Sequence, residues 1–301
     1  MAQRILITGA DGFLGARLAA YYEREYEVIR AGRRPAGAEE PMACGVKYRS
    51  FDISDEPSVS RVFEQERPDI VLHCGAVSDV GACERSPELS RRVNVDGTLF
   101  LARACREFGG RLVFMSSDQI YMDQTGMTPN REDTPVSPVN TYGRDKQLAE
   151  HLALEAAPDT VCLRLTWMYD LPVRGLRTNP NLLMKLIHAL VTDERLELPV
   201  WDFRGITWVG EVVSHMEAAW KLPGGIYNYG SENDKSTYDT ALEWLRELAP
   251  ERAGLLDRNE SRFAGRPRNL LIDTKKIGER GIRFETSGAG LARCLKEYGI
   301  R

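Results

Sequence analysis

A tyrosine and a lysine stand four residues apart in the stretch NTYGRDKQLAE, at Tyr142 and Lys146. The stretch has helical periodicity, and residues four apart on a helix lie one above the other, so the phenol and the ammonium could share one site. A cation within a few ångströms stabilises a phenolate and lowers the phenol pKa from about 10. The pair could therefore move protons, although the same spacing on a solvent-facing helix would carry no function.

Polar residues also end a buried strand predicted at 111–116, in the stretch MSSDQIY. Ligands of open parallel sheets bind beyond the carboxyl ends of the strands, so Ser116, Ser117 and Asp118 are expected to face one crevice. A serine hydroxyl there could hold a substrate carbonyl while Tyr142 delivers a proton to it. The combined chemistry is ketone reduction or alcohol oxidation.

A glycine-rich turn follows the first predicted strand, in the stretch TGADGFLG. Gly9, Gly12 and Gly15 recur every three residues, and a helix is predicted from about Phe13, with Leu14 in its first turn. A strand that turns directly into a helix gathers free N–H groups and the positive end of the helix dipole, and glycines let a pyrophosphate approach closely. The turn predicts a dinucleotide site, whereas without a ligand it would be an ordinary glycine-rich turn.

Arginines follow the second predicted strand, in the stretch VIRAGRRP. An Asp or Glu there would accept hydrogen bonds from a ribose 2′-hydroxyl and favour NAD, whereas Arg30, Arg33 and Arg34 favour the 2′-phosphate of NADP. NADP(H) is therefore the expected cofactor, with NAD(H) as the alternative. In the stretch FDISD, Asp52 and Ile53 close the third predicted strand and could flank the adenine.

Short apolar runs explain how these residues could meet at one place. Buried strands are predicted at 4–8, 26–30, 46–51, 69–74, 111–116 and 160–165, and helical patterns at 13–25, 57–66, 88–108 and 141–156. Strands that alternate with helices predict a parallel sheet, because parallel neighbours need right-handed crossovers. The expected fold is α/β, a doubly wound parallel Rossmann sheet with helices on both faces.

The pattern changes after residue 165, where prolines and longer loops separate the predicted elements. Helices are expected near 180–192, 209–221, 237–248 and 287–298. We expect an NADP-binding domain over 1–165 and a smaller C-terminal substrate-binding lobe over 166–301. The stretch GGIYNYG at 224–230 reads as one more strand, so the segment 205–230 is expected to return to the first domain.

Composition points to a small-molecule partner. The 301 residues are 43% hydrophobic, and their net charge of −4 offers no basic surface for nucleic acid or an anionic membrane. No stretch approaches the roughly 18 apolar residues of a membrane span, and the first residues begin a strand without an export signal. A cytoplasmic protein is expected. Six cysteines and four histidines show no metal-ligand spacing, so no metal site is expected.

The order of these features resembles that of extended short-chain dehydrogenase/reductases: a glycine-rich loop, serines at the end of a later strand, then Tyr142 and Lys146 on the next helix. Within that superfamily the stretches SSDQIY, NVDGT, LRLTWMY and RPRNLLIDTKKI resemble dTDP-4-dehydrorhamnose reductases and their relatives. The resemblance spans nearly the whole chain. It implies NADPH-dependent reduction of a nucleotide-linked 4-keto-6-deoxy sugar, and a homodimer is a further expectation on the same ground.

The resemblance also implies roles for individual residues. Tyr142 is the expected proton donor, Lys146 the cation that lowers its pKa and binds the nicotinamide ribose, and Ser117 the holder of the carbonyl. The stretch CGAVSDVGACERSP resembles the segment that runs under the nicotinamide in the reductases. The expected cofactor-binding residues are Gly9, Gly12, Phe13, Leu14, Gly15, Arg33, Arg34, Asp52, Ile53, Gly75, Ala76, Val77, Asn94, Tyr142 and Lys146. The expected substrate-binding residues are Ser78, Asp118, Gln119, Trp167, Arg204 and Arg266.

Two positions bear on the choice among sister reactions. Family dehydratases resemble one another in an Asp–Glu pair where this chain has Asp118 and Gln119, and a neutral amide cannot act as the base. The stretch VWDFRGITWVGEV has Phe203 where the reductases usually carry glutamine, which leaves the identity of the substrate open. A sugar diphosphate needs cationic donors, and the candidates are Arg174, Arg177, Arg204, Arg266 and Arg268.

Three functions therefore stay open. The leading interpretation is a reductase, and a nucleotide-sugar epimerase that keeps its nicotinamide through the cycle is the alternative enzyme. From a different class comes a non-catalytic, cofactor-binding regulatory subunit, in which the Ser117, Tyr142 and Lys146 set would persist without catalysis.

Overall fold

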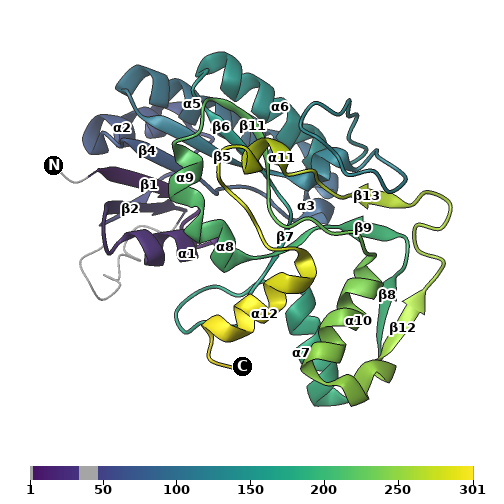
Figure 1. The fold of residues 1–301 in the computed structure, drawn as a ribbon. Helices are drawn as coiled ribbons and strands as arrows, with labels where there is room; N and C mark the ends of the chain where they lie inside the picture. Colours follow the sequence, from purple (N-terminus) through teal and green to yellow (C-terminus); the bar gives the residue numbers. More distant parts are fainter. Residues whose placement is uncertain (1–2, 34–46, 301) are drawn as a thin grey trace.

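The computed structural model describes residues 3–33 and 47–300. At its centre is a seven-stranded sheet in the order β11-β6-β5-β4-β1-β2-β3, in which every neighbouring pair is parallel. Figure 1 shows this sheet between two layers of helices. Its strands are β1 Arg4–Thr8, β2 Glu27–Gly32, β3 Lys47–Ser50, β4 Ile70–His73, β5 Arg111–Ser117, β6 Val161–Leu165 and β11 Gly225–Tyr229. The α/β, doubly wound prediction is confirmed.

The sheet is buried on both faces, as its continuous apolar strands require. Successive side chains point to opposite faces, so Ile5 and Ile7 of β1 join one core and Leu6 joins the other. The first core is covered by α1 Phe13–Tyr22, α8 Val209–Ser214 and α9 Met216–Trp220. The second is covered by α2 Glu56–Glu66, α5 Gly97–Phe108 and α6 Thr141–Ala156.

Two predicted helices are interrupted. The one expected at 88–108 consists of α4 Pro87–Arg91, a π-helical turn η1 Arg92–Asp96, and α5. The one expected at 209–221 divides at His215, because the Tyr22 hydroxyl donates to the Val213 carbonyl (2.9 Å) and accepts from the Glu217 N–H (3.0 Å). These two groups would otherwise bond to each other in a continuous helix, so an inserted side chain explains the break.

A second group of elements lies at one end of the sheet, in the lower part of Figure 1. Its helices are α7 Leu182–Thr192, α10 Thr237–Leu248 and α12 Ser287–Glu297, packed around buried Trp244 and Tyr169. Three short parallel pairs complete it: β7 Trp167–Tyr169 with β10 Ile206–Trp208, β8 Leu196–Pro199 with β12 Leu256–Asn259, and β9 Asp202–Arg204 with β13 Arg268–Leu270.

These short strands escape prediction because three or four residues that pair with a distant segment show no periodicity. The remaining short elements are α3 Val80–Arg85, η2 Asp118–Tyr121, η3 Pro250–Leu255 and α11 Lys275–Gly278. No helix in the described part of the chain has both the length and the apolar character needed to span a membrane.

Candidate active site

A cleft of about 530 Å³ opens at the carboxyl ends of the parallel strands, where the strand order reverses between β1 and β4. It gathers residues from both halves of the chain. The predicted site residues that line it are Gly9, Gly12, Phe13, Leu14, Gly15, Arg33, Asp52, Ile53, Gly75, Ala76, Ser78, Ser117, Tyr142 and Lys146. The glycine-rich loop from Gly9 to Gly15, called the phosphate loop below, and the predicted proton donor Tyr142 therefore share one cavity.

The glycine-rich loop fits a pyrophosphate. Gly9 has φ +65°, and a Cβ there would lie 2.7 Å from the Gly75 nitrogen, so this loop and the loop after β4 touch along their backbones. A Cβ on Gly15 would lie 2.3 Å from the Gly9 carbonyl oxygen. Gly12 is the N-cap of α1, and no described side chain caps that first turn. Its N–H groups are therefore open to an anion in the cleft.

The end of the cleft where the adenosine is expected is lined by Gly32, Arg33, Asp52 and Ile53. Burial opposes the charge of Asp52, but two hydrogen bonds from Ser54 (2.9 and 2.8 Å) and the nearby Arg33 hold its pKa below the ordinary value. Gly32 was not among the predicted site residues, although its place at the end of β2 is where a ribose-binding acid would stand.

Of the three arginines predicted to favour NADP, the structure describes Arg30 and Arg33, and Arg33 lines the cleft. Arg30 is buried, pairs with Glu23 (2.7 Å) and does not line the cleft. Its position inside β2 turns the side chain toward α1 and not toward the cleft. Arg34 lies outside the described residues.

The loop after β4 is held from behind by Asn94. Its Oδ1 accepts from the Val77 N–H (2.8 Å) and its Nδ2 donates to the Val77 carbonyl (3.1 Å). Neither Val77 nor Asn94 lines the cleft, whereas Gly75, Ala76 and Ser78 do. Asn94 therefore supports the wall of the cleft without lining it, through its hydrogen bonds to the backbone of Val77.

A buried histidine supports the same wall. His73 Nδ1 lies 2.7 Å from the Thr8 hydroxyl, which also accepts from the Gly75 N–H (3.3 Å), and its Nε2 lies 3.1 Å from the Thr98 hydroxyl. Thr98 donates to the Asn94 carbonyl (2.7 Å), so its oxygen is an acceptor for a proton on Nε2. Burial, and then the charge of Lys146, lower the pKa of His73 to about 3. The histidine is therefore neutral and structural.

Tyr142 and Lys146 stand in the first turns of α6, as the spacing predicts. Asn140 caps the helix by accepting from the Gly143 N–H (2.6 Å). The Lys146 ammonium donates to the carbonyl of Met115 (2.7 Å) and lies 5.7 Å from the centre of the Tyr142 ring. One face of one helix therefore presents both groups to the cleft.

The expected lowering of the Tyr142 pKa by Lys146 is not what this geometry produces. Burial raises the pKa of Tyr142, the negative charge of Asp118 adds to the rise, and a hydrogen bond with Ser117 opposes it. Burial also lowers the pKa of Lys146, to about 8. The phenol consequently holds its proton firmly, because desolvation outweighs the neighbouring charge.

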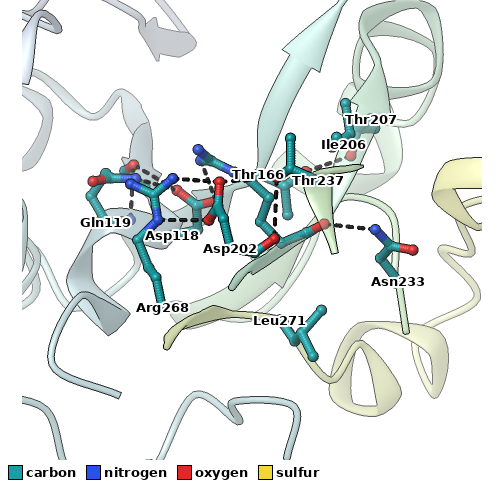
Figure 2. Close-up of polar contacts among 12 residues, drawn as sticks. Asp118, Gln119, Thr166, Asp202, Ile206, Thr207, Asn233, Thr237, Arg268 and Leu271 are labelled. Carbon is teal, nitrogen blue, oxygen red and sulfur yellow. Dashed lines mark hydrogen bonds and ion pairs between the residues drawn. The ribbon is translucent and has the colours of Figure 1, made fainter. Parts of the chain in front are cut away.

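Asp118 faces a separate polar cluster next to the cleft, shown in Figure 2 together with Gln119, Asp202 and Arg268. Its Oδ2 accepts from Arg204 (3.1 Å), whose guanidinium lies 5.2 Å from the centre of the Trp167 ring. Burial raises the pKa of Asp118, and Arg204 opposes the rise. The predicted substrate residues Asp118, Gln119, Trp167 and Arg204 thus converge from three segments, outside the lining of the main cleft.

The remaining arginines that were candidates for binding a sugar diphosphate lie in different surroundings. Arg268 pairs with Asp202 through two hydrogen bonds of 2.6 Å, so this side chain joins β13 to β9 and is committed to a structural ion pair (Figure 2). Arg266 donates to the Asp123 carbonyl (2.9 Å). Arg177 lines the main cleft instead of the Asp118 cluster, as does Asn179.

Several residues of the cleft were not predicted. They are Thr8, Asp11, Ala31, Gly32, Phe51, Cys74, Val93, Met115, Leu165, Thr166, Met168 and Asn179. Those at strand ends could have been found from the rule that ligands bind there, whereas those after β6 enter through tertiary packing alone. Ser116, which was expected to face the crevice, and Arg177, a candidate donor to a sugar diphosphate, also line the cleft. The described residues contain no group of three or more His, Cys, Asp or Glu that could hold a metal.

Comparison with known proteins identifies the family of this chain. Residues 3–300 match the family model described as the RmlD substrate binding domain. A dTDP-4-dehydrorhamnose reductase of Streptomyces griseus is 30% identical over 290 residues, which cover 93% of this chain and 88% of that protein. A dTDP-4-keto-6-deoxy-D-glucose reductase of Streptomyces niveus is 28% identical over 287 residues, which cover 94% and 92%.

Solved structures share the fold. The dTDP-4-dehydrorhamnose reductase of Bacillus anthracis, in complex with NADP, has a TM-score of 0.81 at 20% identity, covering 99% of this chain and 100% of that one. The Bordetella bronchiseptica enzyme WbmG, in complex with NAD, has a TM-score of 0.80 at 20% identity, covering 100% and 96%. The chain belongs to the RmlD substrate binding domain family, among the dTDP-4-dehydrorhamnose reductase-like members of the extended short-chain dehydrogenase/reductases, a superfamily of NAD(P)-dependent oxidoreductases.

Proposed function

We propose that this protein reduces the ketone of a nucleotide-linked 4-keto-6-deoxy sugar with NADPH. The observation that carries the proposal is that Ser117, Tyr142 and Lys146 line the same cleft as the phosphate loop. A substrate bound in this cleft would therefore meet the proton donor, the hydroxyl that holds its carbonyl and the bound dinucleotide together. The relatives named as reductases of dTDP-linked sugars support the choice of substrate class.

The cleft fits an extended dinucleotide. The phosphate loop would hold the pyrophosphate, since a Cβ at Gly9 or Gly15 would collide with backbone and no described side chain caps α1. Arg33 would bind the 2′-phosphate, and Asp52 and Ile53 would flank the adenine. When bound, the nicotinamide supplies the hydride that reduces the carbonyl carbon.

Tyr142 supplies the proton. Its pKa is raised by burial, so at neutral pH the phenol is protonated and ready to donate to the ketone oxygen as that oxygen gains negative charge. Ser117, which shares a hydrogen bond with Tyr142, holds the same oxygen. Both residues are at most 9% exposed, which limits the access of water to the carbonyl.

Lys146 stands beside the phenolate that this transfer leaves. Its ammonium lies 5.7 Å from the centre of the Tyr142 ring and is anchored on the Met115 carbonyl. A positive charge there lowers the energy of the phenolate as it forms, even though burial dominates the resting phenol. In the same position Lys146 can donate to the nicotinamide ribose.

The substrate enters from the side of Trp167 and Arg204. Trp167 itself does not line the cleft, although its neighbours in the chain, Thr166 and Met168, do. Lys185 (5.8 Å) and Arg204 (5.2 Å) both approach the Trp167 ring, and these two cations would bind the diphosphate of the sugar nucleotide. Asp118 positions Arg204 from behind.

Oxidation of free NADPH tests the proposal. The purified protein is given a panel of dTDP- and UDP-linked 4-keto-6-deoxy sugars, and loss of NADPH absorbance is followed beside Tyr142→Phe. We expect turnover by the parent and a loss of at least a hundredfold in Tyr142→Phe, because general acid catalysis contributes roughly 10² to 10⁴. Tyr21→Phe, which removes an exposed hydroxyl, should leave turnover unchanged.

Each alternative function has its own outcome. Isomerisation of a nucleotide sugar without net NADPH loss would identify an epimerase. Cofactor binding with no chemistry on any substrate would favour the regulatory subunit, and full turnover by Tyr142→Phe would reject the assigned proton donor.

A further inference from the structure

The segment 171–181, between β7 and α7, is fixed at its base. Asn181 donates through Nδ2 to the Asp170 carbonyl (3.1 Å), and its Oδ1 accepts from the Met184 N–H (3.0 Å), which caps α7. Asn181 is fully buried. The two ends of the segment are therefore tied to each other and to a helix.

The segment is also fixed near its middle, by Arg17 of α1. The Arg17 guanidinium is only 6% exposed, pairs with Asp170 (2.6 Å), and donates to the carbonyls of Arg177 (2.8 Å) and Phe13 (2.9 Å). It also packs on the Phe13 ring, 4.1 Å from its centre. One buried cation thus joins the segment to the first turn after the phosphate loop.

This anchorage positions the Arg177 side chain. Its carbonyl is held against α1, and Arg177 as a residue is exposed and lines the cleft, as does Asn179. Because Gly12 and Phe13 line the same cleft, the segment forms a wall that faces the phosphate loop. The wall brings a guanidinium to a cavity made mostly by the other half of the chain.

The charges in the cleft show what Arg177 could bind. Among the described residues that line it, the cations are Arg33, Lys146 and Arg177. Arg33 stands with Asp52 at the adenosine end, and Lys146 stands with Tyr142 at the nicotinamide end. The pyrophosphate between these ends carries two negative charges, while the phosphate loop itself contains an acid, Asp11, and no cation. Backbone N–H groups alone would leave most of that charge uncompensated.

We propose that Arg177 binds the cofactor pyrophosphate from the side opposite the phosphate loop, with Arg17 as the residue that holds its backbone there. The inference rests on the proposed function, since it requires a dinucleotide in this cleft. A guanidinium offers a fork of donors that matches two phosphate oxygens, which suits this place better than a lysine.

The test is a binding titration of the full chain, without turnover. Dissociation constants for NADPH are measured by nicotinamide fluorescence, and those for adenosine 2′-monophosphate by calorimetry. The proteins compared are the parent, Arg177→Ala, Arg177→Lys, Arg174→Ala and Arg33→Ala. Arg174 is an exposed arginine of the same segment that does not line the cleft, so it controls for general charge.

We expect Arg177→Ala to weaken NADPH binding roughly tenfold, the usual effect of losing one charged hydrogen bond. Arg177→Lys should recover part of the loss and Arg174→Ala should cause none. Adenosine 2′-monophosphate has no pyrophosphate, so its affinity should be the same in Arg177→Ala and in the parent, whereas Arg33→Ala should weaken it.

Two results would overturn the inference and leave the proposed function intact. One is equal NADPH affinity in the parent, Arg177→Ala and Arg174→Ala. The other is an equal loss for adenosine 2′-monophosphate and NADPH in Arg177→Ala, which would assign Arg177 to the 2′-phosphate. Failure of the parent to bind either NADPH or NADH would instead reject the proposed function, and the inference with it.

Discussion

The side-chain amide of Asn94 makes two hydrogen bonds with the backbone of Val77. Its Oδ1 accepts from the Val77 N–H (2.8 Å), and its Nδ2 donates to the Val77 carbonyl (3.1 Å). Asn94 is 1% exposed and lies in the π-helical turn that interrupts the helix predicted at 88–108. The turn places an amide beside a loop that has no regular secondary structure. The wall of the cleft formed by Gly75, Ala76 and Ser78 thereby gains a fixed shape.

Replacing Asn94 by alanine should loosen this wall. The Val77 N–H and carbonyl would lose their partners, at a cost of about 2 kcal/mol in the free energy of unfolding. We also expect weaker NADPH binding, because the loop would have to be ordered on binding. Urea denaturation and a fluorescence titration measure the two effects. Unchanged stability together with unchanged affinity would show that the pair does not support the site.

The reductase reaction should slow as pH rises through about 8. Burial lowers the pKa of Lys146 to about 8, so its positive charge is present below that pH and lost above it. The Tyr142 phenol has a raised pKa and stays protonated over the same range. A plot of kcat against pH for the parent and for Lys146→Arg measures this. Arginine keeps its charge, so the alkaline fall should move to higher pH, and an unmoved fall would exclude Lys146 as its source.

Acid should destabilise the protein through His73. Its pKa is lowered by burial to about 3, against about 6.5 in the unfolded chain, so between these values only the unfolded state takes up the proton. The stabilising contribution is therefore complete above pH 6.5 and lost as pH falls toward 3, and its size is on the order of a few kcal/mol.

The variant His73→Gln provides the measurement. Glutamine can bond with Thr8 or Thr98 but does not titrate, so its stability should change less between pH 7 and pH 5 than that of the parent. Thermal denaturation at the two pH values gives the comparison. Equal slopes for both proteins would contradict the assignment of this acid sensitivity to His73.

The buried ion pair of Arg17 and Asp170 should contribute more to the free energy of unfolding than the hydrogen bond from Tyr298 to Asp170 does. Asp170→Asn leaves the Arg17 charge buried without its counter-ion, for which we expect a loss of about 3 to 5 kcal/mol. Tyr298→Phe removes a single hydrogen bond to Asp170 (2.9 Å), for which about 1 kcal/mol is expected. Chemical denaturation of both variants tests the order of the two effects, and a larger loss in Tyr298→Phe would contradict it.

Local sequence signals determined the sheet and the helix that carries Tyr142 and Lys146. β1 and α6 have the predicted bounds, 4–8 and 141–156, because an apolar strand or an amphipathic helix shows its periodicity within its own residues. The glycines of the phosphate loop and the spacing of Tyr142 and Lys146 were likewise readable, since strand ends and helix faces bring such residues to one edge of a parallel sheet.

Only the tertiary structure decided what depends on distant partners. The sequence does not show that three arginines have different surroundings. Arg30 in β2 pairs with Glu23, Arg268 joins two short strands through Asp202, and Arg177 lines the cleft. The pKa of Tyr142 was misjudged for a related reason. Spacing shows which charge stands nearby, whereas burial, which raises this pKa, is a property of the packed site as a whole.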